Sequence, residues 1–150
     1  MPHFENSRDI QIAADPATVR SLIVDFRAWT RWSPWEELDP DLQRTYSGAE
    51  QGVGAHYAWE GNKKVGTGTM EIVRATDEEV EIDLQFLKPF KARNRTVFQV
   101  TGNPAGTRVL WAMSGERNVL MAIAGKLFFD KAIAKDFDKG LAKLKAAAEA

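Results

Sequence analysis

Residues 79–86 read Glu-Val-Glu-Ile-Asp-Leu-Gln-Phe, and this stretch decides the fold. Val80, Ile82, Leu84 and Phe86 alternate with polar residues, a pattern typical of a strand with one buried face and one wet face. Strands of a parallel sheet are usually apolar on both faces, whereas antiparallel strands show this alternation. The stretch therefore predicts an antiparallel sheet.

Similar short runs lie on both sides of this strand, separated by links rich in glycine, asparagine or proline. Consecutive strands with short turn-like links favour an antiparallel meander. Ile10 and Ile12 alternate with polar residues and predict the end of an earlier strand, which makes about seven in all. The six later strands are predicted near residues 42–47, 54–60, 66–75, 79–87, 92–101 and 106–115.

Helices are predicted before and after the meander. Asp15-Pro16 provides an N-cap and a proline at the first helical position, and this helix is expected to reach Phe26. A second helical turn should hold Trp29 and Trp32. The last segment, about 127–148, has an apolar stripe at helical spacing and is long enough to lie across the sheet. This order predicts an α+β fold with a curved antiparallel sheet, two short helices after the first strand and a long C-terminal helix.

The composition is that of an ordinary globular chain. The 150 residues are 44% hydrophobic and 27% charged, with a net charge of -1 and no cysteine. We therefore expect one domain spanning 1–150, a cytoplasmic location, and neither nucleic-acid binding nor stable membrane insertion. The longest apolar run, Val119–Phe129, is too short to cross a bilayer. The polar N-terminus, His3 included, is expected to be loose.

The predicted sheet carries more inward apolar side chains than one helix can cover. A helix is only about 10 Å wide, and the C-terminal helix offers few large partners. Exposed apolar patches of this size are rare, so a ligand pocket between the sheet and this helix is one interpretation, and a tightly curled, self-filled sheet is the other. The predicted inward residues are Ile10, Ile12, Tyr57, Trp59, Met70, Ile72, Val80, Ile82, Leu84, Phe86, Phe98, Val100, Val109, Trp111 and Met113.

An ordered set of motifs resembles the polyketide cyclase/dehydrase branch of the START-like (SRPBCC, Bet v 1-like) superfamily. The motifs are Trp29-Thr30-Arg31-Trp32-Ser33-Pro34-Trp35-Glu36, Tyr46-Ser47-Gly48, Gly52-Val53-Gly54-Ala55, Trp59-Glu60-Gly61-Asn62, Gly66-Thr67-Gly68-Thr69-Met70, Asp136-Phe137-Asp138-Lys139-Gly140-Leu141 and Leu144-Lys145. The resemblance implies a helix-grip fold with a hydrophobic cavity, and relatives that bind lipids, sterols, polyketides or aromatic compounds. No cofactor is predicted.

The predicted ligand-binding residues are mainly large apolar side chains on the inner face and the long helix. They are Trp32, Trp35, Tyr57, Trp59, Met70, Leu84, Phe86, Asn94, Phe98, Trp111, Met113, Met121, Phe129, Ile133 and Phe137. Trp32 and Trp35 either line the mouth of the pocket or are plain core residues. Tyr57, Trp59 and Trp111 bond either a ligand or protein carbonyls.

Few residues are candidates for chemistry. Tyr57 with Asn94 is the best polar pair, although Asn94 and Thr96 belong either inside the cavity or at the wet end of their strand. His56 should point outward because it alternates against Tyr57. Asp39 and Asp41 look like a solvated loop, so no metal site is predicted.

Four glycine-containing features complete the pattern. Gly52-Val53-Gly54 and Gly66-Thr67-Gly68 lead into strands, which indicates turns and close strand approach rather than phosphate loops. Gly140 lies near the inner stripe of the last helix and either permits close packing or leaves space for a ligand. Residues 117–127, with Gly125 and Met121, are predicted to form the mouth together with the 32–35 loop, and the alternative is that they are the first, well-packed part of the last helix.

Three functions are open at this stage. The chain is a binding protein for a hydrophobic small molecule, an enzyme that cyclises, dehydrates or isomerises an aromatic or polyketide-like substrate, or an interaction module like the Hsp90-activator relatives of this fold. The binding protein needs an apolar interior, the enzyme needs two polar side chains that converge in the cavity, and the interaction module needs an exposed apolar patch. Oligomers are compatible with all three.

Overall fold

The computed structural model describes residues 3–35, 39–62, 66–88, 91–116 and 128–150. The helices are α1 (Pro16–Ile23), the 3-10 helix η1 (Phe26–Arg31) and α3 (Phe128–Glu149). The strands are β1 (His3–Ile12), β2 (Gln43–Gly48), β3 (Ala55–Glu60), β4 (Thr67–Ala75), β5 (Glu79–Lys88), β6 (Ala92–Asn103) and β7 (Gly106–Glu116). This is the predicted helix-grip order.

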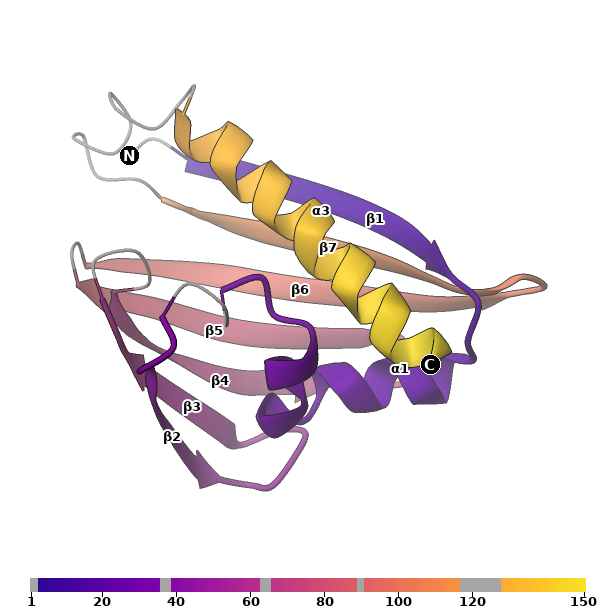
Figure 1. Ribbon diagram of the computed structural model, residues 1–150, viewed down its shortest axis with the longest axis horizontal. Helices are drawn as coiled ribbons and strands as arrows, with labels where there is room; N and C mark the ends of the chain where they lie inside the picture. The colour runs from indigo at the N-terminus through magenta and orange to yellow at the C-terminus, as the bar shows by residue number, and fades with distance from the viewer. Residues whose placement is uncertain (1–2, 36–38, 63–65, 89–90, 117–127) are drawn as a thin grey trace.

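The seven strands form one antiparallel sheet in the order β1-β7-β6-β5-β4-β3-β2. The meander from β2 to β7 confirms the prediction from the turn-like links, and β1 closes the sheet against β7. α3 lies across one face of the sheet on the side of β1 and β7, with α1 and η1 also on this face (Figure 1). The strands β2 to β5 curve away from α3 in this view.

The N-terminal strand is longer than the sequence indicates. His3 was expected in a loose terminus, but β1 begins there and pairs with β7 along its whole length, from His3 opposite Glu116 to Ile12 opposite Thr107. The polar residues of this stretch are tolerated because a strand alternates its faces and Asp9 points outward, where it bonds Arg108. The polar character of these residues therefore hid the first part of β1, which forms because it pairs with the distant strand β7.

The two short helices have separate caps. Asp15 accepts a hydrogen bond from the Thr18 amide at 2.7 Å, which starts α1 as predicted. Phe26 was expected in this same helix, but α1 stops at Ile23 and Asp25 caps η1 by accepting from the Arg27 amide at 3.0 Å. The second cap is what turns the chain and aims Trp29 and Trp32 into the interior.

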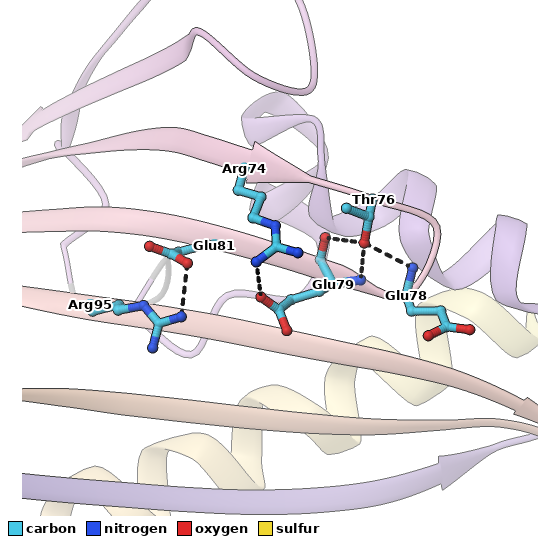
Figure 2. A network of polar contacts seen from close by, with 6 residues as sticks. All are labelled: Arg74, Thr76, Glu78, Glu79, Glu81 and Arg95. Carbon is cyan, nitrogen blue, oxygen red and sulfur yellow. Dashed lines mark hydrogen bonds and ion pairs between the residues drawn. The ribbon is translucent and has the colours of Figure 1, made fainter.

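The outer face of the sheet is covered by charged pairs (Figure 2). Arg95 bonds Glu81 at 2.8 Å across β6 and β5, and Arg74 lies 3.5 Å from Glu79. The Thr76 hydroxyl accepts from the Glu79 amide at 3.0 Å and so closes the β4–β5 turn. Exposed pairs add little stability, but they keep this face solvated. The face available for an apolar ligand is therefore the inner one.

Candidate functional site

The inner face confirms the alternation predicted from the sequence. Across the sheet, Tyr57 pairs with Met70, Met70 with Leu84, and Leu84 with Asn94, so these side chains form one continuous row. Trp59 and Phe86 lie beyond this row and are half-buried, with their rings 5.8 Å apart edge to face. We call this surface the floor, defined by Tyr57, Trp59, Met70, Leu84, Phe86, Asn94, Thr96 and Met113.

A group of aromatic rings fills the space beside the floor. Trp111 is 1% exposed and stacks on Phe137 of α3 with ring centroids 4.1 Å apart and an angle of 12°. The ring of Phe98 also stacks on that of Trp111, with ring centroids 5.0 Å apart. Trp32 is fully buried, and its indole donates to the Leu22 carbonyl at 2.8 Å. We call Trp29, Trp32, Phe98, Trp111 and Phe137 the aromatic cluster.

The aromatic cluster bears on two of the open interpretations. Trp32 is fully buried and its indole is bonded to Leu22 of α1, while its contact with a ligand stays a prediction. Gly140 is a close-packing residue, because a Cβ there would lie 2.9 Å from both the Pro34 ring and Cζ3 of Trp111. Both outcomes follow from a helix that presses directly on this part of the sheet.

Replacing Gly140 by alanine is expected to destabilise the protein although alanine favours helices by about 1 kcal/mol. The Pro34 and Trp111 rings are rigid, so the added methyl must displace α3 and cost about 1–3 kcal/mol by overpacking. Urea denaturation of Gly140→Ala measures the net change. Ala146→Gly, on the exposed side of the same helix, gives the propensity effect alone. A stabilised Gly140→Ala would mean that space is available beside Trp111.

Four buried polar atoms on the inner face have no hydrogen-bond partner in the described part of the chain. They are Asn6 Nδ2, Asn94 Oδ1, Thr96 Oγ1 and Trp111 Nε1. Asn94 is 5% exposed and Thr96 3%, so both lie inside rather than at a wet strand end. Leaving a buried polar group unpaired costs about 1–3 kcal/mol, so something other than the described side chains is needed to satisfy these atoms.

Asp136 is a carboxyl that the sequence analysis missed as a site residue. It lies on α3 next to Phe137, and burial raises the pKa of its carboxyl, while a hydrogen bond from Trp35 and the charges of Lys139 and Lys135 oppose this shift. Asp136 was visible only as part of the helix motif. Its burial depends on the contact between α3 and the loop that follows η1, which no local pattern predicts.

Asp136→Asn is expected to stabilise the protein at pH 7. A raised pKa in the folded state means that ionisation of Asp136 costs stability as pH rises from the ordinary aspartate value of about 3.9. The amide keeps an acceptor for Trp35 and removes that cost. Urea midpoints at pH 7 and pH 3.5 should show a gain at the higher pH that shrinks at the lower one. Asp138→Asn, which loses an exposed pair with Arg8, should give no gain; a gain from both variants would assign the effect to net charge.

Other predicted residues have clear positions. His56 points outward, and its Nδ1 lies 3.4 Å from the Ser47 hydroxyl. Asp39 was expected in a solvated loop, but it is buried. Its burial is tolerated because its carboxylate accepts hydrogen bonds from the backbone amides of Asp41 and Asn62 at 2.9 and 2.8 Å. Within the described ranges, no three His, Asp or Glu side chains gather as a metal site.

Parts of the predicted site remain predictions. Met121, the proposed mouth at 117–127, and the side chains of Phe129 and Ile133 fall outside the described residues. Trp35 is half-buried and its ring lies 5.8 Å from that of Trp111. An open depression of about 560 Å³ lies elsewhere, beside α1, and none of the predicted ligand-binding residues lines it. Its lining is Pro16, Ala17, Arg20, Ser21, Val24, Gln51, Gly52 and Asp77.

A family model described as "Polyketide cyclase / dehydrase and lipid transport" matches residues 1–149. None of the curated proteins matches the sequence. None of the described helices is long and apolar enough to cross a bilayer.

Several solved structures share the fold at low identity. A Staphylococcus aureus protein of unknown function, SA2116, has a TM-score of 0.73 at 14% identity, with 98% of this chain and 94% of that chain covered. The di-domain ARO/CYC BexL from the BE-7585A biosynthetic pathway has a TM-score of 0.72 at 15% identity, with 99% and 50% covered. The Aha1 dimer from Colwellia psychrerythraea has a TM-score of 0.68 at 17% identity, with 97% and 96% covered.

Proposed function

This chain belongs to the polyketide cyclase/dehydrase and lipid transport family, and on that premise we propose that it binds a hydrophobic small molecule on the floor, beneath α3. The ligand class is a lipid, a polyketide or an aromatic compound. The observation that carries the proposal is the set of unpartnered polar atoms among the mainly apolar residues of the inner face, since a ligand would satisfy them.

The two parts of the inner face have different roles in this proposal. The aromatic cluster is fully packed and anchors α3, so it acts as the rigid wall of the site. The floor holds the half-buried rings of Trp59 and Phe86, which have area left to contact a ligand. Trp59 rests directly on Gly68, where a Cβ would lie 2.5 Å from its ring, so the strand positions this indole closely.

Binding is tested with 1-aminoanthracene, a neutral apolar dye that becomes brighter when it leaves water. We expect a saturable increase in its emission. Phe86→Asp places a charge on the floor and should weaken binding about tenfold or more, because a charge is costly to bury beside an apolar ligand. Leu87→Asp is the matched control, since Leu87 is the next residue and is 44% exposed. No saturable signal, or equal losses in the two variants, would contradict a site on the floor.

A second candidate function is catalysis of the cyclase/dehydrase type, and the observation that favours it is Asp136. A carboxyl whose pKa is raised by burial holds a proton more readily, which suits a general acid. Tyr57 and Asn94 are the other candidates for polar contact with a substrate. Turnover of a polyketide-like substrate that Asp136→Asn abolishes, with binding retained, would support the enzyme over the binding protein.

The third function, an interaction module, has less support. Such a module needs a sizeable exposed apolar patch. The large apolar side chains exposed in the described ranges are Val53, Val73 and Leu87, on the 49–54 turn, β4 and β5. These are few, and the outer face around them is charged.

A further inference from the structure

We propose that Asn6, Asn94, Thr96 and Trp111 form a specificity-determining polar strip that selects a neutral ligand with hydroxyl and carbonyl groups over a carboxylate lipid. This rests on the proposed function, because the strip and the floor share one site. It goes further by stating which ligand chemistry the site recognises and which atoms recognise it.

The four side chains lie close together on one face of the sheet. Asn6 of β1 pairs with Met113 of β7, and Met113 pairs with Thr96 of β6. Asn94 is two residues from Thr96 on the same strand, and Trp111 is two residues from Met113. Neighbouring strands lie about 4.8 Å apart and residues two apart on a strand about 6.6 Å. The four atoms therefore lie within the span of one small molecule.

The strip is uncharged and contains both hydrogen-bond donors and hydrogen-bond acceptors. The indole N–H of Trp111 and Nδ2 of Asn6 donate, Oδ1 of Asn94 accepts, and the Thr96 hydroxyl does either. A ligand that satisfies all four atoms therefore needs an acceptor such as a carbonyl and a donor such as a hydroxyl.

The strip offers no charge to an anionic ligand. The inward residues described on β5, β6 and β7 carry no charged side chain. Arg44 of β2 shares the inner face, opposite Trp59, but it lies four strands away from the part of the strip on β6. Arg8 of β1 follows Asn6 on the same face, but its guanidinium is bonded to Asp138 of α3 at 2.7 Å. A carboxylate buried on this strip would lose its hydration without gaining a cation, which is strongly unfavourable. A neutral hydroxyl or carbonyl pays a much smaller desolvation cost.

Three probes test the selection by isothermal titration calorimetry. Naringenin carries hydroxyl groups and a ketone, flavanone has the same rings without the hydroxyl groups, and palmitate is a carboxylate lipid. We expect naringenin to bind the native chain about tenfold more tightly than flavanone, and palmitate to bind most weakly. Equal affinities for naringenin and flavanone, or tightest binding of palmitate, would contradict the proposed selectivity of the strip but would still show a binding site. If none of the three binds, the proposed function fails as well.

Variants assign the effect to the strip. Thr96→Val removes the hydroxyl at nearly constant volume. It should lower the affinity for naringenin about tenfold and leave the affinity for flavanone unchanged. Thr96→Ser should restore most of that loss. Thr101→Val is the matched control, on the exposed face of the same strand. Asn94→Leu is the second variant and should show the same selectivity.

The stability of Thr96→Val gives an independent readout. If the Thr96 hydroxyl bonded only groups of the protein itself, its removal would lower the stability of the fold. An unpartnered buried hydroxyl can be replaced by a methyl group without loss of stability. We expect an unfolding midpoint equal to or above that of the native chain. A destabilised Thr96→Val that also loses flavanone and naringenin equally would contradict the proposal and assign Thr96 to the core.

Discussion

Trp111→Ala is expected to lower the free energy of unfolding by about 3–5 kcal/mol, the range for deleting a large buried aromatic side chain. Trp111 is 1% exposed and contacts rings from four other elements or loops, including Phe98, Trp32 and Phe137. Its removal leaves a cavity that rigid neighbours cannot fill. Urea or guanidinium denaturation, followed by circular dichroism, measures the loss.

Two controls separate packing from hydrogen bonding at this position. Trp111→Phe keeps a ring against Phe137 and should lose much less stability, because the indole N–H has no partner in the described chain to lose. Trp59→Ala removes a half-buried indole from the floor and should cost less than Trp111→Ala. If Trp111→Ala is no more harmful than Trp59→Ala, the aromatic cluster is not the anchor of α3.

Phe137→Ala is expected to cost about 3–5 kcal/mol as well, and to loosen α3 specifically. Phe137 is fully buried and stacks on Trp111 at 4.1 Å, so it is a direct packing contact between the helix and the sheet. Hydrogen exchange should become faster in α3 than in the β4–β5 hairpin, which does not depend on this contact. Lys135→Ala, on the exposed side of α3, should change neither quantity.

A double-mutant cycle tests whether the two rings act as a unit. The double variant Trp111→Ala with Phe137→Ala should cost less than the sum of the single variants, by about 0.5–1.5 kcal/mol for a stacked aromatic pair. Additive losses would mean that each ring is stabilised by other neighbours and that the stack itself contributes little.

The sheet was predictable because its signal is local. Val80, Ile82, Leu84 and Phe86 alternate with polar residues on a face that is solvated, so the inward positions of β5 follow from the sequence alone. The turns between the strands of the meander have their own residues, and the order β2 to β7 follows from them. His56 was placed outward by the same alternation.

The site was less predictable because it depends on contacts between distant segments. Asn6 lies in a polar stretch and becomes buried only when β1 pairs with β7. Asn94 and Thr96 alternate correctly, but alternation does not say which end of β6 the rest of the chain covers. Asp136 of α3 is half-buried and bonds Trp35, which is far from it in the sequence. Each of these depends on a long-range partner that leaves no periodic signal.

The most direct test of the account is a two-dimensional proton–nitrogen NMR titration of the chain with naringenin. Side-chain N–H groups report the site atom by atom, since Trp111, Asn94 and Asn6 each give separate signals. We expect saturable shifts of these three, with smaller changes for the indoles of Trp29 and Trp32, which are bonded to the Ile23 and Leu22 carbonyls. Shifts confined to Arg20, Gln51 and Gly52 would place the ligand in the depression beside α1 and contradict a binding site on the inner face of the sheet.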